Sequence, residues 1–131
     1  MARNRGELTP KEWELMDALW EAGQATATDL QQGLSRRQGW AYSTVKTMLD
    51  RLVAQDYVKF RRVGNVYEYT PRYKRPTVVG KLVDDVTRRI FGGSALPFIQ
   101  TLIERNQLSD EEVRALRKFL DENKPKGGEK P

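Results

Sequence analysis

The 131-residue sequence contains no cysteine and no histidine. Without cysteine, the chain cannot form a disulfide, present a thiol nucleophile or hold a metal through thiolates. Without histidine, it also lacks the commonest general base and the commonest metal ligand. Carboxylates remain at Glu12, Glu14, Asp17 and Glu21, but they belong to one predicted helix that we expect to be solvated. We therefore expect no cofactor, no metal and a protein that is not an enzyme.

Long apolar runs are missing as well. No stretch approaches the roughly 18 apolar residues of a transmembrane helix, and the opening "MARNRGELTPKEW" lacks the apolar core of a secretory signal. These absences predict a cytoplasmic protein without membrane insertion. The chain is 38% hydrophobic, which is enough for a modest core in one ordinary domain or two small ones.

The net charge is +5, but the positive charge is unevenly distributed. Residues 36–75 hold ten lysines and arginines against three acidic residues, whereas the rest of the chain has a slight excess of acids. A localised basic segment indicates a surface that binds a polyanion. Chance clustering on a solvated face is the alternative.

Three helices are predicted in the first 55 residues. Thr9, Pro10 and Glu12 form a marked helix start, and Gly23 supplies its end. A second, short helix begins after Thr26, with Leu30 and Leu34 pointing inward, and a loop over 35–40 follows it. The third helix runs from 42 to about 55.

Beyond the third helix the hydrophobic period changes from 3.6 to 2, as in strands. Gly64-Asn65 tolerates positive φ and suits a tight hairpin turn between two strands. Three helices followed by a hairpin are the order of a winged helix, in which the third helix can enter the major groove and the hairpin, or wing, can lie along phosphates. The expected fold class is mainly α with a small β-hairpin (α+β).

The third helix has two different faces. Its apolar face is expected to pack on the core and consists of Val45, Met48, Leu49 and Leu52. Its outer face is short and rich in hydroxyl groups, which lets the backbone approach a major groove about 12 Å wide. We expect DNA contacts from Tyr42, Ser43, Thr44, Lys46, Thr47 and Arg51. Surface hydroxyls or helix capping are the alternative for the serine and threonines. Asp50 would repel phosphate unless it pairs with Lys46 or accepts a hydrogen bond from the N4 amino group of cytosine.

Flanking residues extend this expected interface. Arg61 and Arg62 precede the wing tip and should project to opposite sides of their strand, so that one can bind phosphate. Arg36 and Arg37 could clamp the backbone or form a solvated loop. We expect the core to include Trp40 and the hairpin residues Tyr67 and Tyr69.

The C-terminal part predicts three further helices with wide apolar stripes. Pro71 and Pro76 bracket a basic connector, so we expect a DNA-binding domain over 1–74, a helical domain over 75–123 and a disordered tail over 124–131. A helical region this small buries little core alone. We therefore expect a homodimer interface, with packing onto the first domain as the alternative. The expected interface residues are Leu82, Val86, Ile90, Leu96, Ile99, Leu102, Ile103, Leu116 and Leu120.

Several segments resemble one known family. "LTPKEWELMDALWEAGQATATDLQQGL", "AYSTVKTMLDRLVAQDYV", the wing "GNVYEYTP" and "FGGS" at 91–94 look like the BlaI/MecI penicillinase-repressor group, which includes CopY-type repressors. The resemblance covers about residues 7–122. It implies a homodimeric winged-helix repressor, with DNA contacts at 43, 44, 46, 47 and 51 and in the wing at 61 and 62.

The resemblance also implies a route of release. Classical members are inactivated when the protease of a membrane-sensor pathway cuts the fifth helix, commonly after an asparagine. That position corresponds to Thr101-Leu102, where the asparagine is absent. The cysteine motif of copper-sensing members is absent too. We therefore expect a sequence-specific repressor that binds a palindromic double-stranded DNA operator as a homodimer. A winged-helix protein-interaction module without specific DNA binding is the alternative.

Overall fold

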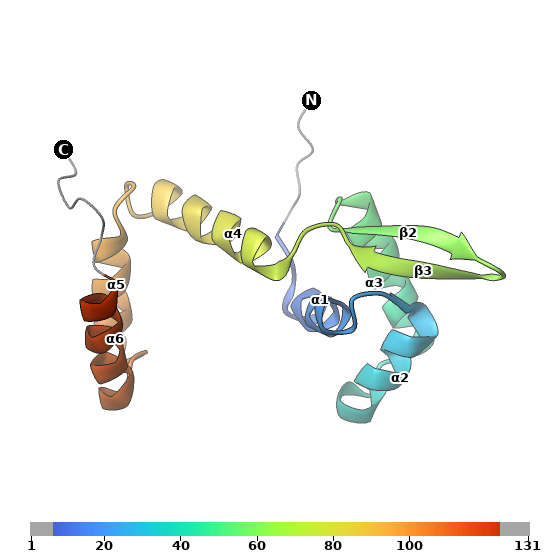
Figure 1. Ribbon diagram of the computed structural model, residues 1–131, viewed down its shortest axis with the longest axis horizontal. Coiled ribbons are helices and arrows are strands. Elements are labelled where there is room, and N and C mark those ends of the chain that lie inside the picture. Colours follow the sequence, from blue (N-terminus) through green and yellow to red (C-terminus); the bar gives the residue numbers. More distant parts are fainter. Residues whose placement is uncertain (1–6, 124–131) are drawn as a thin grey trace. The chain divides into compact units, whose positions relative to one another are not determined.

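The computed structural model describes residues 7–123, and the tail predicted to be disordered over 124–131 lies outside them. This part of the chain is mainly helical with a small antiparallel sheet, which confirms the expected fold class (Figure 1). The elements are, in chain order, α1 (Pro10–Ala22), β1 (Ala25–Thr26), α2 (Ala27–Gln38), α3 (Tyr42–Ala54), β2 (Val58–Val63), β3 (Val66–Pro71), α4 (Arg75–Arg89), α5 (Ala95–Glu104) and α6 (Asp110–Glu122). They form two compact units that divide within α4, between Lys81 and Leu82.

The helices of the first unit begin and end where local chemistry favours it. Thr9 and Glu12 form the predicted capping box of α1, and Gly23 ends the helix with a φ of 85°. Thr26 and Asp29 exchange the same reciprocal hydrogen bonds at the start of α2. The loop predicted over 35–40 is partly wrong, because α2 continues to Gln38. The first strong breaker is Gly39, whose φ is 68°.

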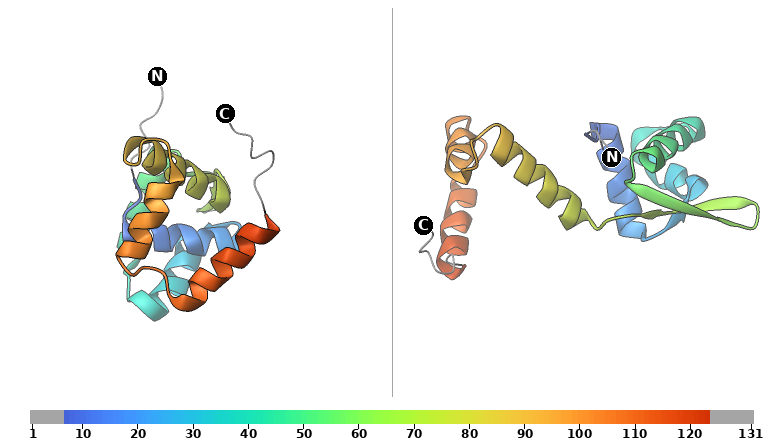
Figure 2. Two further views of the ribbon diagram at one scale, coloured as in Figure 1. Left: turned by 90° about the vertical axis from the view of Figure 1, so that its left-hand side faces the viewer. Right: turned by 90° about the horizontal axis from the view of Figure 1, so that it is seen from above.

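The sheet has one strand more than the sequence suggested. Its order is β1-β3-β2, and the short β1 pairs antiparallel with β3 through Ala25 opposite Tyr69. In the predicted hairpin, Phe60 lies opposite Tyr69. Gly64 alone of the two central turn residues has a positive φ, 64°. Figure 2 shows the tip of this hairpin projecting beyond α1, α2 and α3.

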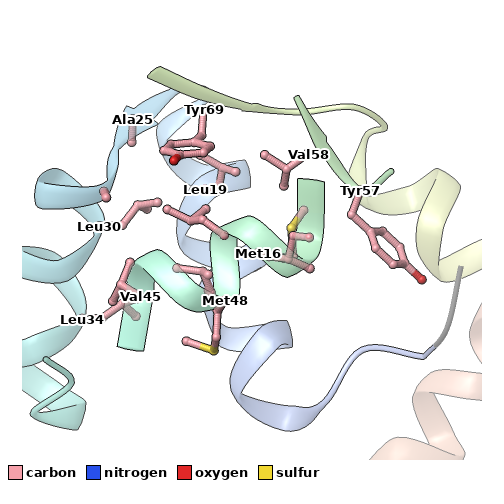
Figure 3. Close-up of a cluster of buried hydrophobic side chains, with 14 of the residues drawn as sticks. Met16, Leu19, Ala25, Leu30, Leu34, Val45, Met48, Tyr57, Val58 and Tyr69 are labelled. Atoms are coloured by element: carbon pink, nitrogen blue, oxygen red, sulfur yellow. The ribbon is translucent and has the colours of Figure 1, made fainter. Parts of the chain in front are cut away.

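One apolar core joins these three helices to the sheet. Side chains from every element of the first unit up to β3 meet in it, as Figure 3 shows for Met16 and Leu19 of α1, Leu30 and Leu34 of α2, Val45 and Met48 of α3, and Val58 and Tyr69 of the hairpin. The predicted inner face of α3 is confirmed, since Val45, Met48, Leu49 and Leu52 are all buried. The predictions for Trp40 and Tyr69 are confirmed as well.

The prediction that Tyr67 belongs to the hairpin core is wrong. Tyr67 is 43% exposed because it lies opposite Arg62 near the turn, past the part of the hairpin that the core covers. Alternation in a strand shows which side chains share a face, but it does not show how far along the strand that face remains covered.

The second unit lacks a closed core. None of the residues in α4, α5 or α6 is buried, although all three helices are described completely. Phe91 and Phe98 stack with their ring centres 5.1 Å apart. Ser109 and Glu112 form the capping box of α6, whereas the side chain of Ser94 at the start of α5 accepts no capping hydrogen bond.

The first turn of α4 belongs to the first unit. The indole N–H of Trp20 donates to the carbonyl of Tyr73 at 2.8 Å, and Arg75 forms an ion pair with Asp17 at 2.8 Å. Val78 packs against the core. These contacts explain why the compact units divide after Lys81, although the connector's composition suggested a boundary at residue 74. Between residues 7 and 123, no helix has the length and apolarity needed to cross a membrane.

Candidate nucleic-acid interface

The outer face of α3 is available to a ligand. Tyr42, Ser43 and Thr47 are exposed, while Thr44 and Lys46 are half-buried at the edges of that face. The apolar residues between them are fixed in the core, so the helix presents its outer side chains from a rigid support. The structure therefore brings together six predicted contact residues on one helix: Tyr42, Ser43, Thr44, Lys46, Thr47 and Arg51.

Lys46 is held by Asp50 on the same face. Its ammonium nitrogen lies 2.9 Å from a carboxylate oxygen of Asp50, one helical turn away, which confirms the predicted pair. This hydrogen bond raises the pKa of Lys46 above its usual value, and the nearby Tyr69 adds to that effect. Burial raises the pKa of Tyr69, while the charge of Lys46 opposes that rise.

A shallow groove of about 100 Å³ lies between α3 and the wing. Phe60 and Tyr67 face each other edge to face, with ring centres 5.0 Å apart, and form its aromatic wall. Sequence reasoning placed DNA contacts on either side of this groove but missed the groove itself. The sequence did hold a signal for the groove, because strand alternation places Phe60, Tyr67 and Tyr69 on one face of the hairpin. The groove is lined by Lys46, Asp50, Val53, Phe60, Tyr67 and Tyr69.

Arg51 takes part in an ion pair that the sequence did not suggest. Its Nε lies 3.2 Å from Oε2 of Glu12, while more than half of its side chain is exposed. The expectation that Glu12 is solvated is therefore wrong, because Glu12 is almost completely buried. A charged residue of a surface helix is normally exposed, and only the approach of α3 to the start of α1 explains this exception.

The two arginines of the wing lie on opposite faces of β2, as predicted. Arg61 is opposite Glu68 of β3 and forms an ion pair with it at 3.1 Å. Arg62 is opposite Tyr67, and its Nε donates to the carbonyl of Gly64 at 3.1 Å. Both side chains are exposed, so their guanidinium groups can also reach an anion. Arg36 and Arg37 belong to α2, but their side chains lie outside the described part of the structure.

The residues predicted for a dimer interface are spread over the second unit. Five are exposed (Leu82, Ile90, Leu96, Ile103 and Leu120) and four are half-buried (Val86, Ile99, Leu102 and Leu116). Thr101 and Leu102, the predicted cleavage position, lie within α5, where the Thr101 hydroxyl donates to the carbonyl of Pro97 at 2.8 Å. Among the residues from 7 to 123, no cluster of acidic side chains could hold a metal ion.

Comparison with known proteins assigns the family. The penicillinase repressor family model matches residues 8–122. An uncharacterized 16.5 kDa protein of Latilactobacillus sakei is 28% identical over 120 residues, which are 92% of this chain and 82% of the relative. The penicillinase repressor of Bacillus licheniformis is 25% identical over 118 residues, which are 90% of this chain and 92% of the relative.

A solved structure supports the fold of the first unit. The solution structure of the DNA-binding domain of the repressor BlaI matches 56% of this chain and 90% of its own, with a TM-score of 0.52 and 24% identity. At this identity the likeness establishes a common winged-helix fold and no more. Together with the family match over nearly the whole chain, it shows that the chain belongs to the penicillinase repressor (BlaI/MecI) family of winged-helix, DNA-binding transcriptional repressors, which are not enzymes.

Proposed function

We propose that this repressor binds a palindromic operator as a homodimer and reads its sequence with α3. The observation that carries the proposal is the outer face of α3, where small hydroxyl side chains flank Lys46 inside the basic segment of the chain. Small side chains let the helix backbone approach base edges, and a lysine can donate to guanine acceptors or phosphates. The curated relative from Bacillus licheniformis carries the name penicillinase repressor.

The proposed contacts divide into two classes. Ser43, Thr44, Lys46 and Thr47 would face the major groove and supply sequence preference. Tyr42, Arg51, Arg61 and Arg62 would bind the phosphates and set the register of the protein on the duplex. Homodimerisation through the second unit would place two copies of α3 on two half-sites, so that the symmetry of the operator mirrors that of the protein.

Selection from a random duplex library with the wild-type protein tests this proposal. We expect enrichment of one inverted repeat, and binding to it should weaken steeply with salt because lysines and arginines displace counterions from DNA. Lys46→Ala should lower the affinity for the selected duplex and relax the preference for its sequence. Lys118→Ala removes an exposed lysine from α6 and serves as the matched control. Failure to enrich any sequence would refute the proposal.

Release from the operator would follow proteolysis at Thr101-Leu102 in the proposed mechanism. Proteases bind an extended backbone, whereas this peptide bond lies inside α5. Cleavage would therefore require local unwinding of α5 and would separate the rest of the second unit from the DNA-binding unit. Mass spectrometry of the repressor recovered from induced and uninduced cells tests this step. Intact chains under both conditions would exclude it.

One observation favours the alternative of a protein-interaction module. The wing exposes four large apolar side chains, Phe60 and Tyr67 on one face of the hairpin and Val63 and Val66 on the other, and exposed apolar side chains are typical of contacts with another protein. Sedimentation of the repressor with and without the selected duplex separates the two functions. A complex with DNA supports the repressor, whereas an unchanged sedimentation coefficient at low salt supports the module.

A further inference from the structure

Glu12 is a buried carboxylate with two different partners. Only 2% of Glu12 is exposed, and among the described residues it is the only charged one that is buried. Its Oε1 accepts a hydrogen bond from the backbone N–H of Thr9 at 2.9 Å, which completes the cap of α1. Its Oε2 lies 3.2 Å from Nε of Arg51 near the end of α3. The same side chain therefore joins the start of α1 to the DNA-facing helix.

Helix capping alone does not explain this arrangement. In α6, Ser109 and Glu112 form the same reciprocal capping box, with distances of 3.0 and 3.1 Å, while Glu112 is exposed. A capping glutamate thus needs neither burial nor an arginine. Burial of a carboxylate carries a large desolvation penalty that a well-placed cation offsets. The burial of Glu12 against Arg51 therefore indicates a role beyond the cap.

The geometry leaves Arg51 able to bind an anion. The contact with Glu12 involves Nε, at the base of the guanidinium group, and 54% of the arginine side chain remains exposed. Because a guanidinium carries five N–H donors in a fixed plane, its terminal amino groups can still donate to a phosphate oxygen. A carboxylate at Nε restricts the rotation of the side chain and reduces the entropy that Arg51 loses on binding DNA.

We propose that Glu12 is a positioning residue for DNA binding: it holds Arg51 in the orientation in which Arg51 contacts a phosphate, without touching DNA itself. This inference rests on the proposed function, since it requires Arg51 to lie at the DNA interface. It extends the set of residues that determine operator affinity to the buried side of α1.

Glu12→Gln separates the two roles of this side chain. Glutamine also completes a capping box, so the variant keeps the cap while it loses the ion pair. We expect its affinity for the duplex selected by the wild-type protein to fall about three- to tenfold, the effect of releasing one ordered side chain. Fluorescence anisotropy at several salt concentrations measures this loss. Glu112→Gln makes the same change in the capping box of α6 and is expected to leave the affinity unchanged.

Arg51 is changed to lysine in the wild-type protein and to glutamine only together with Glu12→Gln. Arg51→Gln alone would leave a buried carboxylate without its cation and could unfold the protein. Arg51→Lys keeps a charge beside Glu12, but a lysine lacks the separate Nε and terminal amino groups, so we expect a loss similar to that of Glu12→Gln. In the Glu12→Gln background, Arg51→Gln should lower the affinity for DNA by no more than about a further twofold. An Arg51 side chain that Glu12 no longer holds has already lost most of its contribution to that affinity. Circular dichroism confirms that each variant is folded.

Three results would overturn the inference. The first is wild-type affinity of Glu12→Gln. The second is a large further loss when Arg51→Gln is added to Glu12→Gln, since Arg51 would then act without Glu12. The third is wild-type affinity of Arg51→Lys. A general effect of Glu12 on folding predicts that second result. If the wild-type protein selects no duplex, the proposed function itself fails. If it selects one and Arg51→Lys binds it normally, only the inference fails.

Discussion

At the scale of the residue, Asp50 places a negative charge on the face of α3 that is proposed to meet DNA. Its carboxylate holds the ammonium of Lys46 at 2.9 Å, and both groups are partly exposed. Exposed pairs of this kind contribute only about 0.3–0.5 kcal/mol to the free energy of unfolding. The pair is therefore too weak to be explained by stability. It does restrain the cation that would bind any phosphate within reach.

We predict that Asp50→Asn binds DNA more tightly but less selectively. The substitution frees Lys46 and removes a charge that repels phosphates, so affinity for a scrambled duplex should rise several-fold. The slope of log affinity against log salt should become steeper by about one. Parallel salt titrations with the selected and the scrambled duplex measure both effects.

Asp121→Asn supplies the control for this prediction, because it changes the net charge equally at an exposed position of α6. Equal effects of the two substitutions would show that net charge, rather than the position of Asp50, governs the affinity. The ratio of affinities for selected and scrambled duplexes should fall only in Asp50→Asn.

The burial of some single residues could be predicted from the sequence, whereas that of others could not. The burial of Val45 and Leu49 followed from helical period alone, because an apolar stripe must face a core. The burial of Glu12 did not, since it depends on Arg51, a residue distant in sequence that comes close only when α3 packs beside α1. The exposure of Tyr67 likewise depends on how far the hairpin extends past the helices.

At the scale of the element, local chemistry predicted the helices and the hairpin well. The capping boxes of α1 and α6 and the turn at Gly64-Asn65 all have short sequence signatures that the structure bears out. The strand β1 could not be predicted, because two residues show no period and pair only when β3 lies beside them. The groove between α3 and the wing was missed for the same reason, since its lining comes from three elements.

Two glycines on different elements are expected to respond oppositely to alanine. Gly64 has a φ of 64° in the wing turn, a conformation that strains an alanine, although open space surrounds the position. We predict that Gly64→Ala lowers the free energy of unfolding by about 1 kcal/mol or more. Gly33 lies in α2 with equally open surroundings, so Gly33→Ala should raise it by about 0.5–1 kcal/mol.

Urea denaturation followed by circular dichroism measures both changes, and the two variants serve as controls for each other. Loss of stability in both would indicate that Gly33 has a packing role rather than open space around it. Unchanged stability of Gly64→Ala would show that the wing turn relaxes at little cost and that the wing is less rigid than its turn geometry implies.

At the scale of the whole molecule, the two units differ in how many of their own apolar side chains they bury. The first has a closed core of fifteen buried apolar residues. The second buries none of the residues of its helices and exposes Ile90, Leu96 and Phe119 by more than half. Such a surface is costly in water, and a second copy of the same unit could cover it. Homodimerisation through this unit would follow from that imbalance.

We predict that Leu96→Asp yields a folded monomer with weak operator affinity. Leu96 is 59% exposed and lies in the first turn of α5, where an aspartate interacts favourably with the helix dipole, so the helix itself should persist. A buried charge in the dimer interface would instead oppose association. Because two linked half-sites bind with a high effective concentration, the loss of the dimer should lower affinity for the inverted repeat by about a hundredfold or more.

Sedimentation velocity and binding to an isolated half-site complete this test. The variant should sediment as a monomer and should bind one half-site as well as the wild-type protein does, because α3 and the wing are unchanged. Val63→Asp makes a similar apolar-to-acidic change at an exposed position of the wing and should leave the dimer intact. If Leu96→Asp remained dimeric, α5 would lie outside the interface. If wild-type protein were already monomeric at the concentrations that saturate the repeat, the apolar surface of the second unit would need a different partner.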